Sequence, residues 1–192
     1  MKMKRKEEGE LLIMVGYLIR KQQYLMTDQV EIPQLLKKHF PILSEPGLVK
    51  AIEEAGEVRT VPAGTVLMDI GSYVKFMPLV VEGAVKVLRE NEVGNELFLY
   101  FLYPGQSCAM TVQCCVVNAP SQVRAIAEED TTFIAIPIKQ VDNWMREFNS
   151  WKEFILTTYS DRFSELLNAV CLWRMRKFRA RESHEGVLHG HA

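Results

Sequence analysis

The sequence has little net charge, few cysteines and no histidine in its central part, and each shortage excludes a class of protein. The formal net charge is -1 over 192 residues, so no overall basic field points to nucleic acid. Four cysteines at irregular spacing do not make a disulfide scaffold, and we expect reduced thiols. No histidine occurs between Glu57 and Ile138, so a metal site built on histidines is not expected there.

A long apolar run is also missing. The basic stretch Lys2–Lys6 precedes the mostly apolar run Leu11–Ile19, as in secretory signals, but no small-x-small cleavage site follows. The run is shorter than the about 20 residues that cross a bilayer. We therefore expect a cytoplasmic protein with no membrane segment. Residues 1–31 would form an extension in which Glu7–Met26 is either an amphipathic helix or a mobile segment docked on a partner.

The next part of the chain changes from a helical to a β pattern. Ile32–Gly56 is predicted to be helical in two pieces, because Pro33 suits a first helical turn and Pro41 and Pro46 interrupt the periodicity. From Glu57 to Ile138, short runs rich in Val, Leu, Phe, Tyr, Ile and Thr are separated by glycine or proline, which favours a β-sandwich or roll. The number and spacing of these runs favour a jelly roll. The predicted strands are Glu57–Val61, Thr65–Met68, Phe76–Val81, Ala84–Arg89, Glu96–Tyr103, Gln122–Ala127 and Thr132–Pro137.

The most regular pattern follows the β-region. After a predicted helix at Lys139–Phe148, Ser150 and Glu153 fit a capping box that starts a longer helix. Apolar residues then recur at alternating spacings of 3 and 4, which is the a/d seam of a coiled coil. The seam residues are Leu156, Tyr159, Phe163, Leu166, Val170 and Trp173.

Two arrangements are compatible with this seam. A single helix could lie along its own β-domain, or two copies of the helix could pair in parallel. Ile155 and Leu167 widen the apolar face enough to serve both the roll and a partner, so we favour pairing. The sequence thus predicts a homodimer formed through residues 150–179.

The β-region resembles the cyclic nucleotide-binding domain of Crp/Fnr regulators. The matching motifs, spread over about eighty residues, put glycines where tight corners need positive φ. They are Val-Pro-Ala-Gly at 61–64, Gly71, Val81-Glu82-Gly83, the turn around Gly94, Tyr103-Pro104-Gly105 and Val123-Arg124-Ala125.

The resemblance implies a fold, a division of the chain and a function. The fold is mainly β, a jelly-roll (double-stranded β-helix) domain with flanking helices and a long C-terminal dimerisation helix. The implied parts are the extension at 1–31, the roll at 32–149, the dimerisation helix at 150–179 and a disordered tail at 180–192. The implied function is the effector-sensing and dimerisation domain of a transcriptional regulator, which is not an enzyme.

In that family a short helical cassette holds the effector's cyclic phosphate, with a Gly-Glu step and, about ten residues later, an Arg-Ser step. Here these steps fall on Ala109-Met110 and Ala119-Pro120, and Arg124 is predicted to belong to the following strand. Each missing charge-assisted hydrogen bond is worth about 1.5 to 3 kcal/mol. We therefore expect no cofactor and no binding of cyclic AMP or cyclic GMP in the family's mode. The degenerate cassette, our candidate effector site, comprises Ser107, Cys108, Ala109, Met110, Thr111, Ala119, Pro120 and Ser121.

Three cysteines lie in or beside this cassette, and two interpretations are open. Cys108, Cys114 and Cys115 could sense redox state or a metal, with Cys171 reaching in from the long helix. Cysteines also serve as small hydrophobes in a buried segment, and we favour this because the zinc-type Cys-x-x-Cys spacing is missing. The pocket could take an unknown small-molecule effector, or it could be collapsed around Met110.

Few residues follow the seam. In the resembling family a winged helix-turn-helix of roughly seventy residues comes next, so we expect a truncated relative without specific DNA binding. Arg174–Arg181 could grip phosphates non-specifically, but a solvated helix end that complements the dipole is favoured. His184, His189 and His191 could chelate a metal weakly, although we expect no built metal site. The alternative function is a cupin-like metal-dependent enzyme on the same β-roll.

Overall fold

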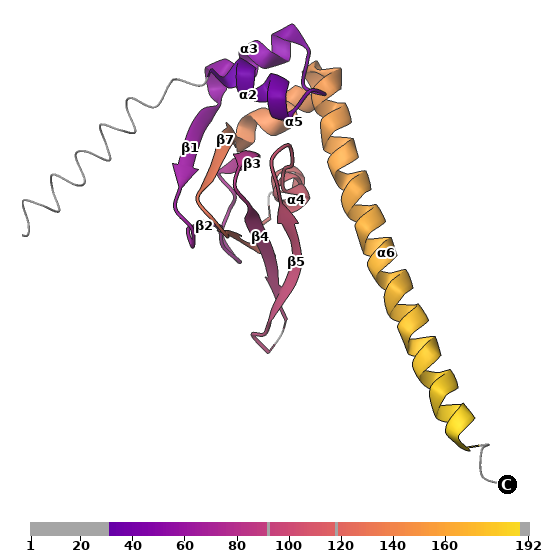
Figure 1. The fold of residues 1–192 in the computed structure, drawn as a ribbon. Coiled ribbons are helices and arrows are strands. Elements are labelled where there is room, and N and C mark those ends of the chain that lie inside the picture. The colour runs from indigo at the N-terminus through magenta and orange to yellow at the C-terminus, as the bar shows by residue number, and fades with distance from the viewer. Residues whose placement is uncertain (1–30, 92, 118, 189–192) are drawn as a thin grey trace, which may run out of the picture.

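The computed structural model describes residues 31–91, 93–117 and 119–188. The helix predicted at Glu7–Met26 lies outside these residues. In chain order, two helices precede a β-roll, a short helix α4 (Ala109–Val117) is inserted in the roll, and two helices follow it (Figure 1).

The two lead-in helices confirm the prediction for this segment. They are α2 (Ile32–His39) and α3 (Pro46–Ala55), each with a proline in its first turn. Proline is tolerated there because the first backbone N–H groups of a helix have no partner within the helix. The apolar residues of each helix bury one face, and Leu36, Leu48 and Ile52 are at most 1% exposed.

The seven strands of the described residues form two antiparallel sheets, which confirms the jelly-roll prediction. One sheet has the order β1-β7-β3 and the other β2-β6-β4-β5. Each predicted strand end lies within two residues of the observed one. The strands are β1 (Glu57–Val61), β2 (Val66–Met68), β3 (Phe76–Glu82), β4 (Val85–Glu90), β5 (Glu96–Leu102), β6 (Arg124–Ala127) and β7 (Thr131–Pro137).

Two glycines with left-handed backbone differ in how much space surrounds them. Gly83 (φ 81°) joins β3 to β4, and a Cβ there would lie 2.5 Å from the carbonyl oxygen of Asp130 and 2.8 Å from the Cα of Thr131. Gly94 (φ 80°) lies in the predicted hairpin turn after β4, where a Cβ would meet nothing within 4 Å. The two glycines thus have the same backbone conformation, but only Gly83 is closely surrounded by other atoms.

We expect Gly83→Ala to destabilise the fold by at least about 1 kcal/mol more than Gly94→Ala. Both variants carry the left-handed penalty of about 1–2 kcal/mol, but only Gly83→Ala must also displace backbone. Urea unfolding followed by circular dichroism measures both. Equal losses in the two variants would show that the enclosure of Gly83 has no energetic weight.

Two apolar clusters form the core, and β3 separates them. Alternate residues of β3, including Met77 and Leu79, pack against α2, α3 and the C-terminal helices. The intervening Val80 faces the interior of the roll. Because both faces of β3 are covered, its sequence is a continuous apolar run, and no alternation could be read from it.

Two helices follow the roll, α5 (Ile138–Glu147) and α6 (Asn149–Leu188). They are joined by a pair of tryptophans, since Trp144 and Trp151 pack edge to face at 5.2 Å between ring centroids. The first turns of α6 lie in the core, and the helix then extends away past the roll (Figure 1). With 40 residues it is about 60 Å long.

The ends of α6 differ from the predicted ones. The helix begins at Asn149, so Ser150 is inside the first turn and the predicted capping box is wrong. Ser150 Oγ instead donates to Glu45 Oε2 at 3.1 Å, a contact between segments 105 residues apart that local spacing does not reveal. At the other end the helix continues beyond residue 179 to Leu188, where a disordered tail had been predicted from 180.

Candidate functional site: the cassette helix and the pairing helix

Helix α4 stands between β5 and β6, where the sequence predicts the cassette. The segment before it is tied to the roll by an antiparallel bridge between Leu79 and Ser107. Beyond its other end, the N–H of Ser121 donates to the carbonyl of Ser72, and the N–H of Gly71 donates to the carbonyl of Ser121, both at 2.8 Å. The predicted site residues therefore form two groups, one before and at the start of the nine-residue helix and one after it.

The hydroxyl groups of the cassette bind within the protein. Ser107 Oγ donates to the carbonyl of Pro78, and Ser121 Oγ donates to the carbonyl of Val123, each at 2.7 Å. Both serines are buried. Of the other predicted residues, Cys108, Ala109 and Thr111 are buried, Met110 and Ala119 are half-buried, and Pro120 is exposed.

The interior of the roll beside α4 is nearly filled. The cavity there, lined by Met68, Leu102, Cys108 and Thr111 among others, has a volume of about 10 Å³. A cavity of this volume holds about one water molecule at most. The side chains that fill the interior are mostly aliphatic, and Val85, Val87 and Leu102 are 0% exposed. A nucleotide could enter only if this cluster rearranged.

Arg124 is the first residue of β6, as predicted, and it binds three carboxylates. Its Nε lies 2.7 Å from Asp69 Oδ1, and its terminal nitrogens lie 2.8 Å from Glu96 Oε1 and 3.1 Å from Glu90 Oε1. The hydrogen bond to Asp69 raises the pKa of Arg124, and the same contact lowers the pKa of Asp69. This arginine therefore ties the ends of three strands and the turn after β2 together, and its donors already face anions.

The described cysteines lie in different surroundings. Cys108 and Cys114 are buried, which agrees with their interpretation as small hydrophobes, and burial raises the pKa of the Cys114 thiol. Cys171 is exposed on α6, which does not support the less favoured interpretation in which it reaches into the cassette. The side chain of Cys115 lies outside the described part of the structure.

A contact that the sequence did not indicate joins α6 to the roll. The guanidinium of Arg162 lies 4.2 Å from the ring centre of Tyr100, and its Nη2 lies 3.3 Å from Gln106 Oε1. Glu165 Oε2 lies 2.7 Å from Arg162 Nη1 and balances the charge of the guanidinium. The Tyr100 hydroxyl in turn lies 3.7 Å from Cys108 Sγ, and burial raises the pKa of Tyr100. Arg162 is one of many charged residues on the polar part of α6, so nothing in the local pattern distinguishes it.

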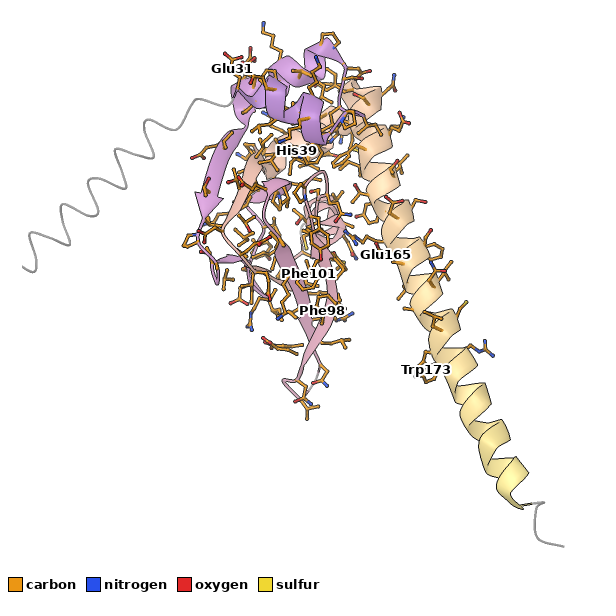
Figure 2. The ribbon with its side chains drawn as sticks, viewed as in Figure 1. Glu31, His39, Phe98, Phe101, Glu165 and Trp173 are labelled. Atoms are coloured by element: carbon orange, nitrogen blue, oxygen red, sulfur yellow. The ribbon has the colours of Figure 1, made fainter. Side chains whose placement is uncertain are left out.

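The predicted seam lies on the surface of the single chain. Its members are 37% to 61% exposed, and Figure 2 shows Trp173 about midway along α6. Ile155 is 1% exposed and belongs to the chain's own core, whereas Leu167 is 48% exposed. The alternative in which the seam packs on its own β-domain is therefore wrong. The seam residues are Leu156, Tyr159, Phe163, Leu166, Val170 and Trp173.

The described residues contain neither a metal-binding cluster nor a membrane-spanning helix. No group of three or more His, Cys, Asp or Glu side chains there could hold a metal ion, so nothing in this part supports the cupin-like alternative. None of the helices in the same part is both long enough and apolar enough to cross a membrane.

Comparisons with known proteins agree on the domain. Residues 58–148 match the family model of the cyclic nucleotide-binding domain. A comparison with curated proteins found no match.

Solved structures share the fold at low sequence identity. The Catabolite Activator Protein of Thermus thermophilus aligns with 70% of this chain at 21% identity and a TM-score of 0.57, and the aligned part is 63% of that protein. A Crp/Fnr-family transcriptional regulator of Eubacterium rectale aligns with 78% of this chain at 22% identity and a TM-score of 0.62, over 74% of its own length. The regulatory domain of Toxoplasma gondii PKA, crystallised with cAMP, aligns with 68% of this chain at 14% identity and a TM-score of 0.57, over 49% of its length.

At these identities the structural likeness concerns the fold. The family match covers the strands from β1 to β7, the inserted helix α4 and α5. The sequence motifs, the two sheets and the family match thus point to one conclusion. Residues 58–148 resemble the cyclic nucleotide-binding domain family, and the chain shares the fold of Crp/Fnr regulators.

Proposed function

We propose that this chain is the effector-sensing and dimerising part of a Crp/Fnr-type transcriptional regulator that does not bind cyclic nucleotides in the family's mode. The domain family and the fold support a regulatory sensing role rather than catalysis. The finer part of the proposal concerns the cassette and α6.

The observation that carries the proposal is the state of the cassette. Ala109 and Met110 stand where the family has its Gly-Glu step, and the cavity that the neighbouring Cys108 and Thr111 line inside the roll has a volume of only about 10 Å³. Cyclic phosphates need donors that a helix N-terminus and an arginine provide together. Here Arg124 is held by Asp69, Glu90 and Glu96 instead.

The exposed seam supports a homodimer through residues 150–179. Leu156, Phe163, Leu166 and Val170 are each 47% or more exposed, in a row that is typical of coiled-coil pairing. Contiguous apolar surface of this kind is rare on a monomer and marks an interaction site. The a/d spacing is typical of pairing with another helix, and we propose a second copy of this chain as the partner.

The edge strand β5 carries another apolar surface. The rings of its aromatic residues Phe98 and Phe101 have centroids 4.9 Å apart (Figure 2). The centroid of the Tyr103 ring lies 5.9 Å from that of Phe101. Phe98 and Tyr103 are exposed, and β5 is unpaired on its outer side within the sheet. We include this row in the surface that pairing covers, because an exposed apolar edge strand is otherwise open to aggregation.

Arg162 gives the sensing part a physical connection to α6. It rests on Tyr100, whose hydroxyl contacts Cys108 at the start of the cassette. A cation over a desolvated ring contributes up to about 2 kcal/mol. A rearrangement of the cassette that moves Tyr100 would therefore change how α6 is held and, through it, the dimer.

Thermal unfolding with cyclic nucleotides tests the proposal. A ligand at about 100 times its dissociation constant adds about 2.7 kcal/mol of stability to the protein that binds it. We expect cyclic AMP and cyclic GMP to leave the unfolding midpoint of this chain unchanged. The Toxoplasma regulatory domain, crystallised with cAMP, is the positive control.

A clear rise with either nucleotide would overturn this account, because it would show that the cassette binds them without the family's Gly-Glu and Arg-Ser steps. An unchanged midpoint together with a rise in the control supports it.

A further inference from the structure

A second cavity, much larger than the one in the roll, lies between α2, the segment before α4, and α6. Its volume is about 260 Å³. The α6 side contributes residues spaced 3, 1, 3 and 1 apart, which lie on one helix face. These residues are Phe154, Thr157, Thr158, Asp161 and Arg162.

Specific contacts hold the walls of this cavity in place. Gly105 has φ 87°, and a Cβ there would lie 2.8 Å from the carbonyl oxygen of His39, so only glycine lets the two segments come so close. On the opposite side, Arg162 ties α6 to Gln106 and Tyr100. The cavity therefore has three walls, each supported by a contact between elements far apart in sequence.

The lining combines an apolar body with hydrogen-bond acceptors. Phe40, Ile42 and Phe154 supply apolar surface. Thr158 Oγ1 donates its proton to the carbonyl of Phe154 at 2.9 Å, so this oxygen can only accept from a ligand. Asp161, an exposed carboxylate at the rim, forms no ion pair with any described residue.

The lining holds two oppositely charged side chains, Asp161 and Arg162. The guanidinium of Arg162 is balanced by Glu165. Burial and Lys38 lower the pKa of His39 below its ordinary 6.5, against the opposite effect of Glu82. Asp161 is then the uncompensated charge, and it favours a cation.

We propose that this cavity binds a small primary amine with an apolar body, whose ammonium group donates to Asp161 and Thr158. A ligand of about nine non-hydrogen atoms, such as 2-phenylethylamine, matches the volume. The bound amine would contact both α6 and the segment before α4. Binding of the amine does not depend on the proposed sensory function.

Calorimetric titration of the full chain with 2-phenylethylamine tests this site. We expect saturable binding with a dissociation constant on the order of 1 mM, as suits so small a ligand. The neutral 2-phenylethanol and the anionic phenylacetate have the same ring, and we expect both to bind at least about tenfold more weakly, which is about 1.4 kcal/mol.

Substitutions at the cavity locate the binding. Asp161→Asn should weaken the amine about tenfold, whereas Asp142→Asn, the same change at an exposed carboxylate on α5 outside the lining, should leave it unchanged. Thr157→Phe, at an exposed position on the rim, should fill the cavity and abolish binding. Far-ultraviolet circular dichroism checks that each variant is folded. If Asp161→Asn does not fold, the result for Thr157→Phe tests the site.

Three outcomes would overturn the site: no saturable binding of the amine, equal binding of phenylacetate, or binding that Thr157→Phe leaves intact. None of them bears on cyclic nucleotides. A midpoint shift with cyclic AMP would instead overturn the proposed function and leave the amine site standing.

Discussion

Phe163→Glu should convert a dimeric protein into a monomer at micromolar concentration. Phe163 lies at the middle of the seam and is 61% exposed in the single chain, so pairing would bury it on both copies. Burying a phenylalanine fully contributes about 1.5–3 kcal/mol. The variant loses this twice and also brings two carboxylates together, so we expect the dimer dissociation constant to rise more than about 100-fold, or about 2.7 kcal/mol.

Sedimentation velocity over a concentration series measures this change. The matched control is Leu172→Glu, which also replaces an exposed apolar residue of α6 (60%) but falls outside the 3,4 spacing of the seam. The control should remain dimeric. A wild-type protein that is monomeric throughout, or a Leu172→Glu variant that dissociates as readily as Phe163→Glu, would contradict pairing through the seam.

Trp151→Ala should be among the most destabilising single substitutions in the described residues. Trp151 is fully buried, packs edge to face on Trp144, and donates from Nε1 to the carbonyl of Val141 at 3.1 Å. Truncation of a buried tryptophan to alanine costs about 3–5 kcal/mol. Because domains of this size are stable by only about 5–15 kcal/mol, the variant loses a large part of its free energy of unfolding.

The control for this prediction is Trp173→Ala, the same substitution at a position that is 61% exposed. Both should be made in the Phe163→Glu background, so that dimerisation does not contribute to the measured stability. Urea unfolding should then show a change within about 0.5 kcal/mol for Trp173→Ala. Similar losses in the two variants would mean that α6 is not anchored in the core through Trp151.

The anchor matters for the proposed function because it determines which part of α6 is free. Trp151, Phe154 and Ile155 hold the first turns against α5 and the core, and the seam begins at Leu156. Arg162 adds a second attachment one turn before Glu165, on Tyr100 of β5. Pairing and sensing therefore use the same helix, and a change at either attachment alters the presentation of the seam.

Local patterns determined much of this protein from the sequence. The seven strands, the two lead-in helices and the 3,4 spacing of the seam follow from residue periodicity and turn chemistry, which act over neighbouring residues. The position of the cassette followed from the motifs on either side of it, Tyr103-Pro104-Gly105 and Val123-Arg124-Ala125, which can be recognised in the sequence alone. The capping box at Ser150 failed because a distant carboxylate, Glu45, is the partner that this serine binds.

Contacts between distant segments decided the rest. The closed interior of the roll, the Arg162–Tyr100 attachment and the cavity at Asp161 each depend on segments that meet only in the folded chain, such as Gln106 and Arg162, 56 residues apart. The sequence alone placed the seam on one helix face, because helical periodicity is a local property. Only the tertiary structure showed that this face stays exposed in the single chain, because the position of α6 is decided by how Trp151 and Phe154 pack in the core.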